Sequence, residues 1–151
     1  MSFILSGGGT GGHFYPALAI ANKLKQHFPE ASILFVGALG KIEMEKAPLA
    51  GYPIEGLNIG GFQRSNMWKN ISLPFKVMNS LLRSRKILNK YKPDVVIGTG
   101  GYASFPLIFS ASRKKIPSLI QEQNFFPGIT NKYLARYVNK VCTVYDGMDQ
   151  Y

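Results

Sequence analysis

A run of glycines followed by a histidine is the first segment of this chain that could do chemistry. The segment Gly7-Gly-Gly-Thr-Gly-Gly-His13 contains five glycines and directly follows a short apolar run. Glycine lets backbone N–H groups approach a ligand closely, and the N-terminus of a following helix favours negative charge. Thr10 adds a hydroxyl group. The segment therefore predicts a site for an anionic ligand such as a diphosphate.

His13 and Glu122 are the two candidate proton acceptors. A neutral imidazole beside a helix N-terminus can accept a proton near pH 7, and the alternative role of His13 is a helix cap. Glu122 lies in Gln121-Glu-Gln-Asn124 and would suit a base if burial raised its pKa. Its alternative role is a hydrogen-bonded structural carboxylate that positions a loop. We predict that His13 is the general base and keep Glu122 as its competitor.

The glycine segment does not predict a nucleotide cofactor. Gly7, Gly9 and Gly12 satisfy the spacing G-x-G-x-x-G of dinucleotide-binding folds, which also place an acidic residue about 20 positions later. The second apolar run instead ends in Val36-Gly-Ala38, and no Gly-Lys-Ser/Thr follows the glycines as in a P-loop. A nucleotide-binding oxidoreductase domain is therefore the weaker alternative, and we expect no cofactor.

Short apolar runs alternate with helical patterns along the chain. We predict strands at 2–6, 32–36, 54–59, 94–98, 117–121 and 140–144, and helices at 16–28, 41–50, 73–91, 103–113 and 129–137. Nearly continuous apolar strands separated by helices are typical of a mostly parallel sheet with helices on both faces. The predicted fold is one doubly wound, Rossmann-like α/β domain that spans residues 1–151.

In such a sheet, ligands bind beyond the carboxyl ends of the strands. The glycine segment, a second glycine turn at 98–101 and the segment 121–124 all follow predicted strands. We therefore expect these three segments, which are far apart in the sequence, to meet at one rim of the sheet.

The composition is that of a folded globular chain. Of the 151 residues, 46% are hydrophobic and 17% are charged, which suits one domain with a sizeable core. No apolar run reaches the ~18–20 residues that cross a bilayer. The single cysteine, Cys142, is interpreted as a core residue, and a reducing compartment is expected. The two histidines, His13 and His27, have no acidic residues at ligand spacing, so we expect no metal.

Positive charge is concentrated in one part of the chain. The formal net charge is +10, and residues 56–93 contain many Lys and Arg but no Asp or Glu. A block of one sign indicates an anionic partner such as phosphate, nucleic acid or a lipid surface. Because the aromatic residues of this block lie in a helical stripe and not on a stacking sheet, nucleic acid is not the expected partner.

The predicted helix at 73–91 carries two apolar stripes. One consists of Leu73, Val77, Leu81 and Leu88 and can face the core. The other is flanked by cations and suits the surface of an anionic membrane, with a tryptophan as interfacial anchor. The alternative is that both stripes are internal, or that the second meets another protein. The predicted membrane contacts are Trp68, Ile71, Phe75, Met78 and Leu82, with Lys69, Lys76 and Arg83.

Four segments together resemble one bacterial enzyme family. They are Gly8-Gly-Thr-Gly-Gly-His13 with Pro16 and Ala19, Tyr91-Lys-Pro-Asp-Val-Val-Ile-Gly-Thr-Gly-Gly-Tyr102, Glu122-Gln-Asn124, and Pro127-Gly-Ile-Thr-Asn-Lys132. Their order and approximate spacing are similar to those of the UDP-N-acetylglucosamine:lipid I N-acetylglucosaminyltransferases of peptidoglycan synthesis. The resemblance extends over the whole chain and concerns the N-terminal domain of that family.

The resemblance implies an inverting, metal-independent hexosyltransferase with the two-domain GT-B fold. N-acetylglucosamine would move from UDP-N-acetylglucosamine to the C4 hydroxyl of the muramoyl sugar of lipid I, which gives lipid II. The enzyme would be peripheral, on the cytoplasmic face of the bacterial inner membrane. This chain would be its acceptor-binding domain without the C-terminal domain that holds most of the UDP-sugar, and would be inactive alone. The alternative is one half of a split glycosyltransferase.

The resemblance also implies roles for residues of the predicted rim. The position of the catalytic base is matched by His13. The positions that contact the donor are matched by Thr10, Gly11, Gly12 and Asn124. The residues that would line the acceptor pocket are Gly100, Gly101, Tyr102 and Ser104. The implied partners are lipid I, UDP-N-acetylglucosamine and an anionic membrane surface.

Overall fold

The computed structural model describes residues 1–61 and 73–148, and at its centre is a six-stranded sheet. The strands are β1 (Ser2–Ser6), β2 (Ser32–Ala38), β3 (Ile54–Leu57), β4 (Val95–Gly98), β5 (Ser118–Glu122) and β6 (Lys140–Thr143). The helices are α1 (Gly11–His27), α2 (Ile42–Leu49), α3 (Leu73–Tyr91), α4 (Ser104–Arg113) and α5 (Ile129–Leu134). The strand order is β3-β2-β1-β4-β5-β6, and every pairing in this sheet is parallel. The predicted doubly wound α/β fold is confirmed.

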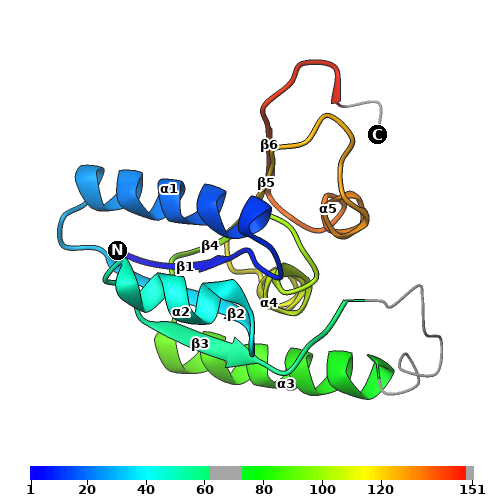
Figure 1. Cartoon of the computed structure of the whole chain (residues 1–151), viewed down its shortest axis with the longest axis horizontal. Helices are drawn as coiled ribbons and strands as arrows, with labels where there is room; N and C mark the ends of the chain where they lie inside the picture. The colour runs from blue at the N-terminus through cyan, green and yellow to red at the C-terminus, as the bar shows by residue number, and fades with distance from the viewer. Residues whose placement is uncertain (62–72, 149–151) are drawn as a thin grey trace.

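The helices form two layers because successive residues of a strand point to opposite faces of the sheet. In β1, Phe3 and Leu5 pack in one core cluster with residues of α1 and α2. Ile4, between them, packs in a second cluster with residues of α3, α4 and α5. All three side chains are buried. The arrangement of the helices around the sheet can be followed in Figure 1.

Helix α1 begins at Gly11, five residues before the predicted start at Pro16. Proline has no N–H to donate to the carbonyl four residues earlier. It is therefore favoured in the first turn of a helix, where that hydrogen bond is not made, and this favoured Pro16 as the predicted start. In the structure Pro16 lies inside α1, and the carbonyl that it leaves free, that of Gly12, accepts a hydrogen bond of 3.1 Å from Gln123 Nε2. The early start places His13 in the first turn of the helix.

The predicted role of Cys142 as a core residue is wrong. Cys142 is half-buried on β6, and its neighbour Val141 is 42% exposed. β6 is an edge strand of the described sheet, so one side of it has no neighbouring strand to cover it.

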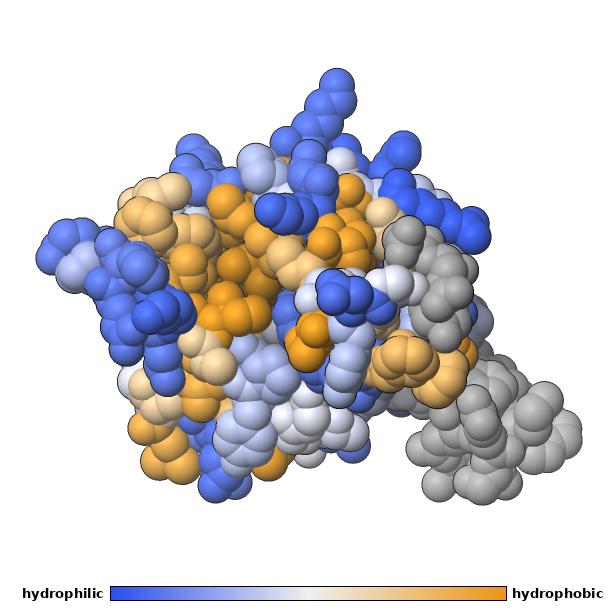
Figure 2. Space-filling view, turned by 90° about the horizontal axis from the view of Figure 1, so that it is seen from above, coloured by the Kyte–Doolittle hydropathy of each residue, from blue (hydrophilic) through white to orange (hydrophobic). Residues whose placement is uncertain are grey.

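Hydrophobic residues also gather on the surface that is seen from above in Figure 2. This is the side of the molecule on which Figure 1 draws α1, α5 and β6. Figure 2 shows hydrophilic side chains around this hydrophobic surface.

Candidate functional site

The three segments predicted to meet at the rim of the sheet do meet. The glycine loop (7–12) follows β1 directly. The turn 98–101 begins at the last residue of β4, and the segment 121–124 begins with the last two residues of β5. Thr99 Oγ1 donates a hydrogen bond of 2.6 Å to the carbonyl of His13, and Thr99 N donates to the carbonyl of Ser6. Gln123 connects the third segment to the first through the carbonyl of Gly12. Figure 1 shows how β1, β4 and β5 lie side by side and bring these segments together.

The first three glycines of the loop make room for the protein's own side chains. A Cβ atom on Gly7 would overlap the Thr99 hydroxyl, and one on Gly8 would overlap the Glu43 carboxylate. On Gly9, which has φ +90°, a Cβ would lie 2.7 Å from the Tyr102 ring. The space beside these three glycines is therefore filled by Thr99, Glu43 and Tyr102. Gly12 is different: it is exposed, and a Cβ there would have Thr10 Oγ1, at 3.9 Å, as its nearest contact.

His13 is half-buried and has two hydrogen-bond neighbours at one ring nitrogen. Its Nδ1 lies 3.1 Å from the carbonyl oxygen of Thr99 and 2.9 Å from Gln123 Nε2. With the ring proton on Nδ1, the ring donates to the Thr99 carbonyl and Nε2 can accept a proton; with the proton on Nε2, Nδ1 accepts from Gln123 Nε2 instead. The first tautomer is the one that a general base requires. Thr99 and Gln123 were not predicted as site residues, because neither can be connected to His13 without the fold.

Gly100 and Gly101 give the His13 ring its space. Both have positive φ angles, +93° and +76°, and a Cβ on either would lie about 3 Å from ring atoms of His13. Together with His13, Glu122 and residues of 128–131, they line a cavity of about 200 Å³. This cavity at the carboxyl edge of the sheet is the candidate site.

Glu122 has the geometry of a structural carboxylate. It is 2% exposed, and it accepts hydrogen bonds from the backbone N–H groups of Asn124 (2.9 Å) and Gly128 (3.0 Å) and from the side-chain amides of Asn124 and Asn131. Burial by itself raises the pKa of the Glu122 carboxyl, but these hydrogen bonds outweigh burial and hold the pKa below its ordinary value. The raised pKa on which a base role for Glu122 depended is absent.

Asn131 is a site residue that was not predicted from the sequence. It is 3% exposed, and its amide donates to the carbonyl of Gln121 at 3.2 Å and to Glu122 Oε2 at 3.0 Å. Asn124, predicted to contact the donor, has its side-chain amide bonded to Glu122 Oε1. Glu122 thus ties the loop after β5 to helix α5.

Tyr102 and Ser104, both predicted to line the acceptor pocket, contact the backbone of neighbouring turns in the structure. Tyr102 is half-buried and covers Gly9. Burial first, and then the nearby Glu43, raise the pKa of its phenol above the ordinary value. Ser104 is completely buried, and its hydroxyl donates to the carbonyl of Gly101 at 2.9 Å. Pocket lining by Ser104 is therefore wrong, because the side chain stabilises the turn from beneath.

Thr10 and the start of α1 remain open to a ligand. Thr10 is exposed and precedes α1 as its N-cap, and in the described structure its side chain makes no capping hydrogen bond. Gly11 and Gly12 occupy the first helical turn, and as its first two residues they have N–H groups without an acceptor in the helix. Among the described residues, no group of three or more His, Cys, Asp or Glu could hold a metal ion.

Helix α3 forms a second candidate surface. Its core face carries the buried residues Ser80, Ser84, Ile87 and Leu88. On another face, Phe75, Met78 and Leu82 are 78%, 58% and 51% exposed, which confirms that the second apolar stripe lies at the surface. Trp68, Lys69 and Ile71 lie outside the described residues. Within the described part of the chain, no helix is long and apolar enough to cross a membrane.

Arg83 does not serve as a free surface cation. Its Nε donates to the carbonyl of Gly56, and its Nη2 lies 2.9 Å from Glu55 Oε2. Glu55 also pairs with Lys90 at 3.4 Å. One acid in β3 is thus shared by two cations, and the Arg83 side chain is still 53% exposed, so its contact with a membrane stays a prediction. Lys76, two turns earlier, is exposed.

Comparisons with known proteins point to one family. The chain matches the glycosyltransferase family 28 N-terminal domain over residues 3–143. It is 52% identical over 151 residues to the UDP-N-acetylglucosamine–N-acetylmuramyl-(pentapeptide) pyrophosphoryl-undecaprenol N-acetylglucosamine transferase of Phocaeicola vulgatus, and 56% identical over 149 residues to that of Flavobacterium psychrophilum. The match covers 100% and 99% of this chain but 40% and 41% of those proteins.

Solved structures agree with these matches. The crystal structure of Acinetobacter baumannii MurG is similar with a TM-score of 0.83 and 30% identity, over 95% of this chain and 41% of that one. A UDP-GlcNAc 2-epimerase from Methanocaldococcus jannaschii, at 21% identity and a TM-score of 0.61, shares the fold. The chain therefore spans about 40% of the length of the relatives that it matches.

Proposed function

Because this chain belongs to the glycosyltransferase family 28 N-terminal domains, we propose that it is the acceptor-binding domain of an inverting N-acetylglucosaminyltransferase. The acceptor is lipid I, the donor is UDP-N-acetylglucosamine held mainly by a second domain, and the product is lipid II. The observation that carries this proposal is the cavity at the strand ends, which His13, Gly100 and Gly101 line beside the open first turn of α1.

In the proposed reaction His13 acts as the general base. With its Nδ1 proton donated to the Thr99 carbonyl, Nε2 takes the proton of the muramoyl C4 hydroxyl. The oxygen then attacks the anomeric carbon of N-acetylglucosamine, and the bond from that carbon to UDP breaks with its electron pair leaving on the diphosphate. Attack from the side opposite the leaving group gives inversion.

The oxidoreductase alternative loses further support from Glu43. A dinucleotide is held by loop N–H groups that face its pyrophosphate. Here the Gly9 N–H already donates to both oxygens of the Glu43 carboxylate, at 3.0 and 3.1 Å. The Glu43 carboxyl group therefore occupies the place from which a pyrophosphate would accept this hydrogen bond. An anionic ligand is therefore expected at Thr10, Gly11 and Gly12 instead.

Titration of the chain with a water-soluble, short-chain lipid I analogue in a calorimeter is expected to show saturable one-to-one binding. The physical reason is that the first-turn N–H groups of α1 and its positive dipole end favour the diphosphate. The same analogue without its diphosphate should bind at least ~10-fold more weakly, and NAD(H) should not bind. A folded chain that gives no heat with the diphosphate analogue contradicts the proposal.

The exposed stripe of α3 supports a membrane-facing role on the cytoplasmic side of the inner membrane. Phe75, Met78 and Leu82 present apolar side chains together, and Lys76 lies among them. Apolar side chains flanked by cations partition into the headgroup region of anionic lipid. This surface would hold the domain where its lipid-linked acceptor lies.

Replacing both Phe75 and Met78 with serine is expected to lower binding to phosphatidylglycerol-containing vesicles about 10-fold, since each side chain gives up apolar burial. Cosedimentation measures the bound fraction. Leu49→Ser is the matched control, because Leu49 is 73% exposed but lies on α2. Equal binding of the double variant and the native chain would refute the membrane role of this stripe.

A further inference from the structure

Glu43 is a buried acid at the candidate site to which the proposed reaction gives no role. It lies in the first turn of α2 and is 0% exposed. A carboxylate without water is costly unless hydrogen bonds or a cation compensate for its charge. The ion pairs among the described residues involve Glu45 and Glu55 but not Glu43. Its compensation must therefore come from hydrogen bonds.

Those hydrogen bonds come from two separate parts of the backbone. Gly9 N, in the glycine loop after β1, donates to both carboxylate oxygens at 3.0 and 3.1 Å. Ala38 N, at the end of β2, donates to Oε1 at 2.9 Å. One side chain thus joins the carboxyl ends of two neighbouring strands and fixes the peptide between Gly8 and Gly9.

The surrounding backbone is built to admit this carboxylate. A Cβ atom on Gly8 would overlap its oxygens, and a Cβ atom on Gly37 would overlap Glu43 Cγ. Gly9 itself adopts φ +90°, a conformation that favours glycine. Three glycines on two segments therefore serve the same contact.

The position of the Gly9 peptide determines the course of the chain into the site. Gly9 is followed by Thr10, whose carbonyl accepts the hydrogen bonds of His13 N and Phe14 N at 3.2 Å that start α1. A shift of Gly9 would move Thr10 and, through the first turn of the helix, the imidazole of His13. Tyr102, against which Gly9 packs, would lose its contact as well.

We infer that Glu43 is a positioning residue, which holds the glycine loop in the conformation that presents Thr10, the first turn of α1 and His13 to the acceptor. The part of this inference that concerns the acceptor rests on the proposed function. The part that concerns the loop rests on the contacts alone, so the two can be tested separately.

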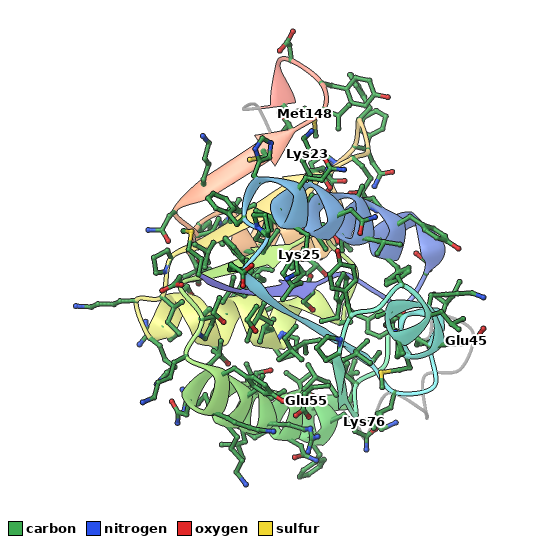
Figure 3. The ribbon with its side chains drawn as sticks, turned by 90° about the vertical axis from the view of Figure 1, so that its left-hand side faces the viewer. Lys23, Lys25, Glu45, Glu55, Lys76 and Met148 are labelled. Carbon is green, nitrogen blue, oxygen red and sulfur yellow. The ribbon has the colours of Figure 1, made fainter. Side chains whose placement is uncertain are left out.

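The test is Glu43→Gln, which keeps the size of the side chain but replaces one acceptor oxygen by an N–H₂ group. The glutamine keeps one oxygen acceptor, but it is neutral, and the N–H₂ group that replaces the second oxygen faces the Gly9 N–H instead of accepting from it. Because the Gly9 bond is weakened, hydrogen exchange of the Gly9 amide, followed by NMR, is expected to become at least ~10-fold faster. Exchange at Leu5 and Ile97, in β1 and β4, should stay unchanged. Affinity for the lipid I analogue should fall at least ~10-fold. Glu45→Gln is the matched control and should change neither, because Glu45 lies on the outside of the same helix (Figure 3).

Unchanged Gly9 exchange in folded Glu43→Gln would overturn the inference, and so would equal acceleration throughout β1 and β4. If Glu43→Gln does not fold, Gly8→Ala decides: it leaves the carboxylate in place but pushes the loop away from it, and it should give the same local loss at Gly9. A native chain that does not bind the lipid I analogue refutes the proposed function, whereas the exchange comparison still decides the role of Glu43 in the loop.

Discussion

Replacing His13 with alanine in a full-length enzyme that carries this domain is expected to lower kcat about 10²–10⁴-fold, the usual contribution of a general base. The half-buried ring occupies a space made by Gly100 and Gly101, and its removal leaves the glycine loop and Glu43 in place. Affinity for the lipid I analogue should therefore change less than ~3-fold. Steady-state transfer kinetics and calorimetric titration measure the two quantities independently.

His27→Ala is the matched control, because His27 is exposed at the other end of α1. It should leave kcat and affinity unchanged. His13→Gln should be as slow as His13→Ala, since a carboxamide can form hydrogen bonds but does not take up a proton. A variant that loses affinity and rate in the same proportion would show that His13 binds the acceptor and is not the base.

Replacing Glu122 with alanine is expected to destabilise the domain by about 3 kcal/mol. The substitution leaves the buried donors of Asn124, Gly128 and Asn131 without their acceptor. Urea unfolding followed by circular dichroism gives the free energy of unfolding. Glu122→Gln should cost less, because it retains one oxygen acceptor. The exposed Glu30→Ala is the control and should lie within about 0.5 kcal/mol of the native chain.

The stabilisation by Glu122 should depend on pH in a defined direction. Its folded-state pKa lies below the ordinary value of 4.5, so the folded state favours the ionised form. The contribution is therefore fully present above the ordinary value and disappears as the pH falls through the folded-state pKa. The difference in unfolding free energy between the native chain and Glu122→Gln should shrink over that range. A difference that grows on acidification would indicate a raised pKa and restore Glu122 as a candidate base.

The sequence by itself was sufficient for the order of strands and helices, because apolar runs and helical periodicity are local patterns of neighbouring residues. It also predicted that the segments after β1, β4 and β5 meet, because parallel strands have their carboxyl ends at one edge. The exposed stripe on α3 followed from the same periodicity. The start of α1 was missed, since Pro16 looked like a helix start until Gln123 was found to satisfy the carbonyl of Gly12.

The tertiary structure alone decided what the site residues do. Burial and four hydrogen bonds, three from the loop after β5 and one from α5, make Glu122 a structural carboxylate. Glu43 reaches the glycine loop from 34 residues away, and no local pattern marks that contact. The glycines of the loop were recognised from the sequence, but their reason was not. A glycine records only that space is needed, and the packed fold determines which atoms fill it.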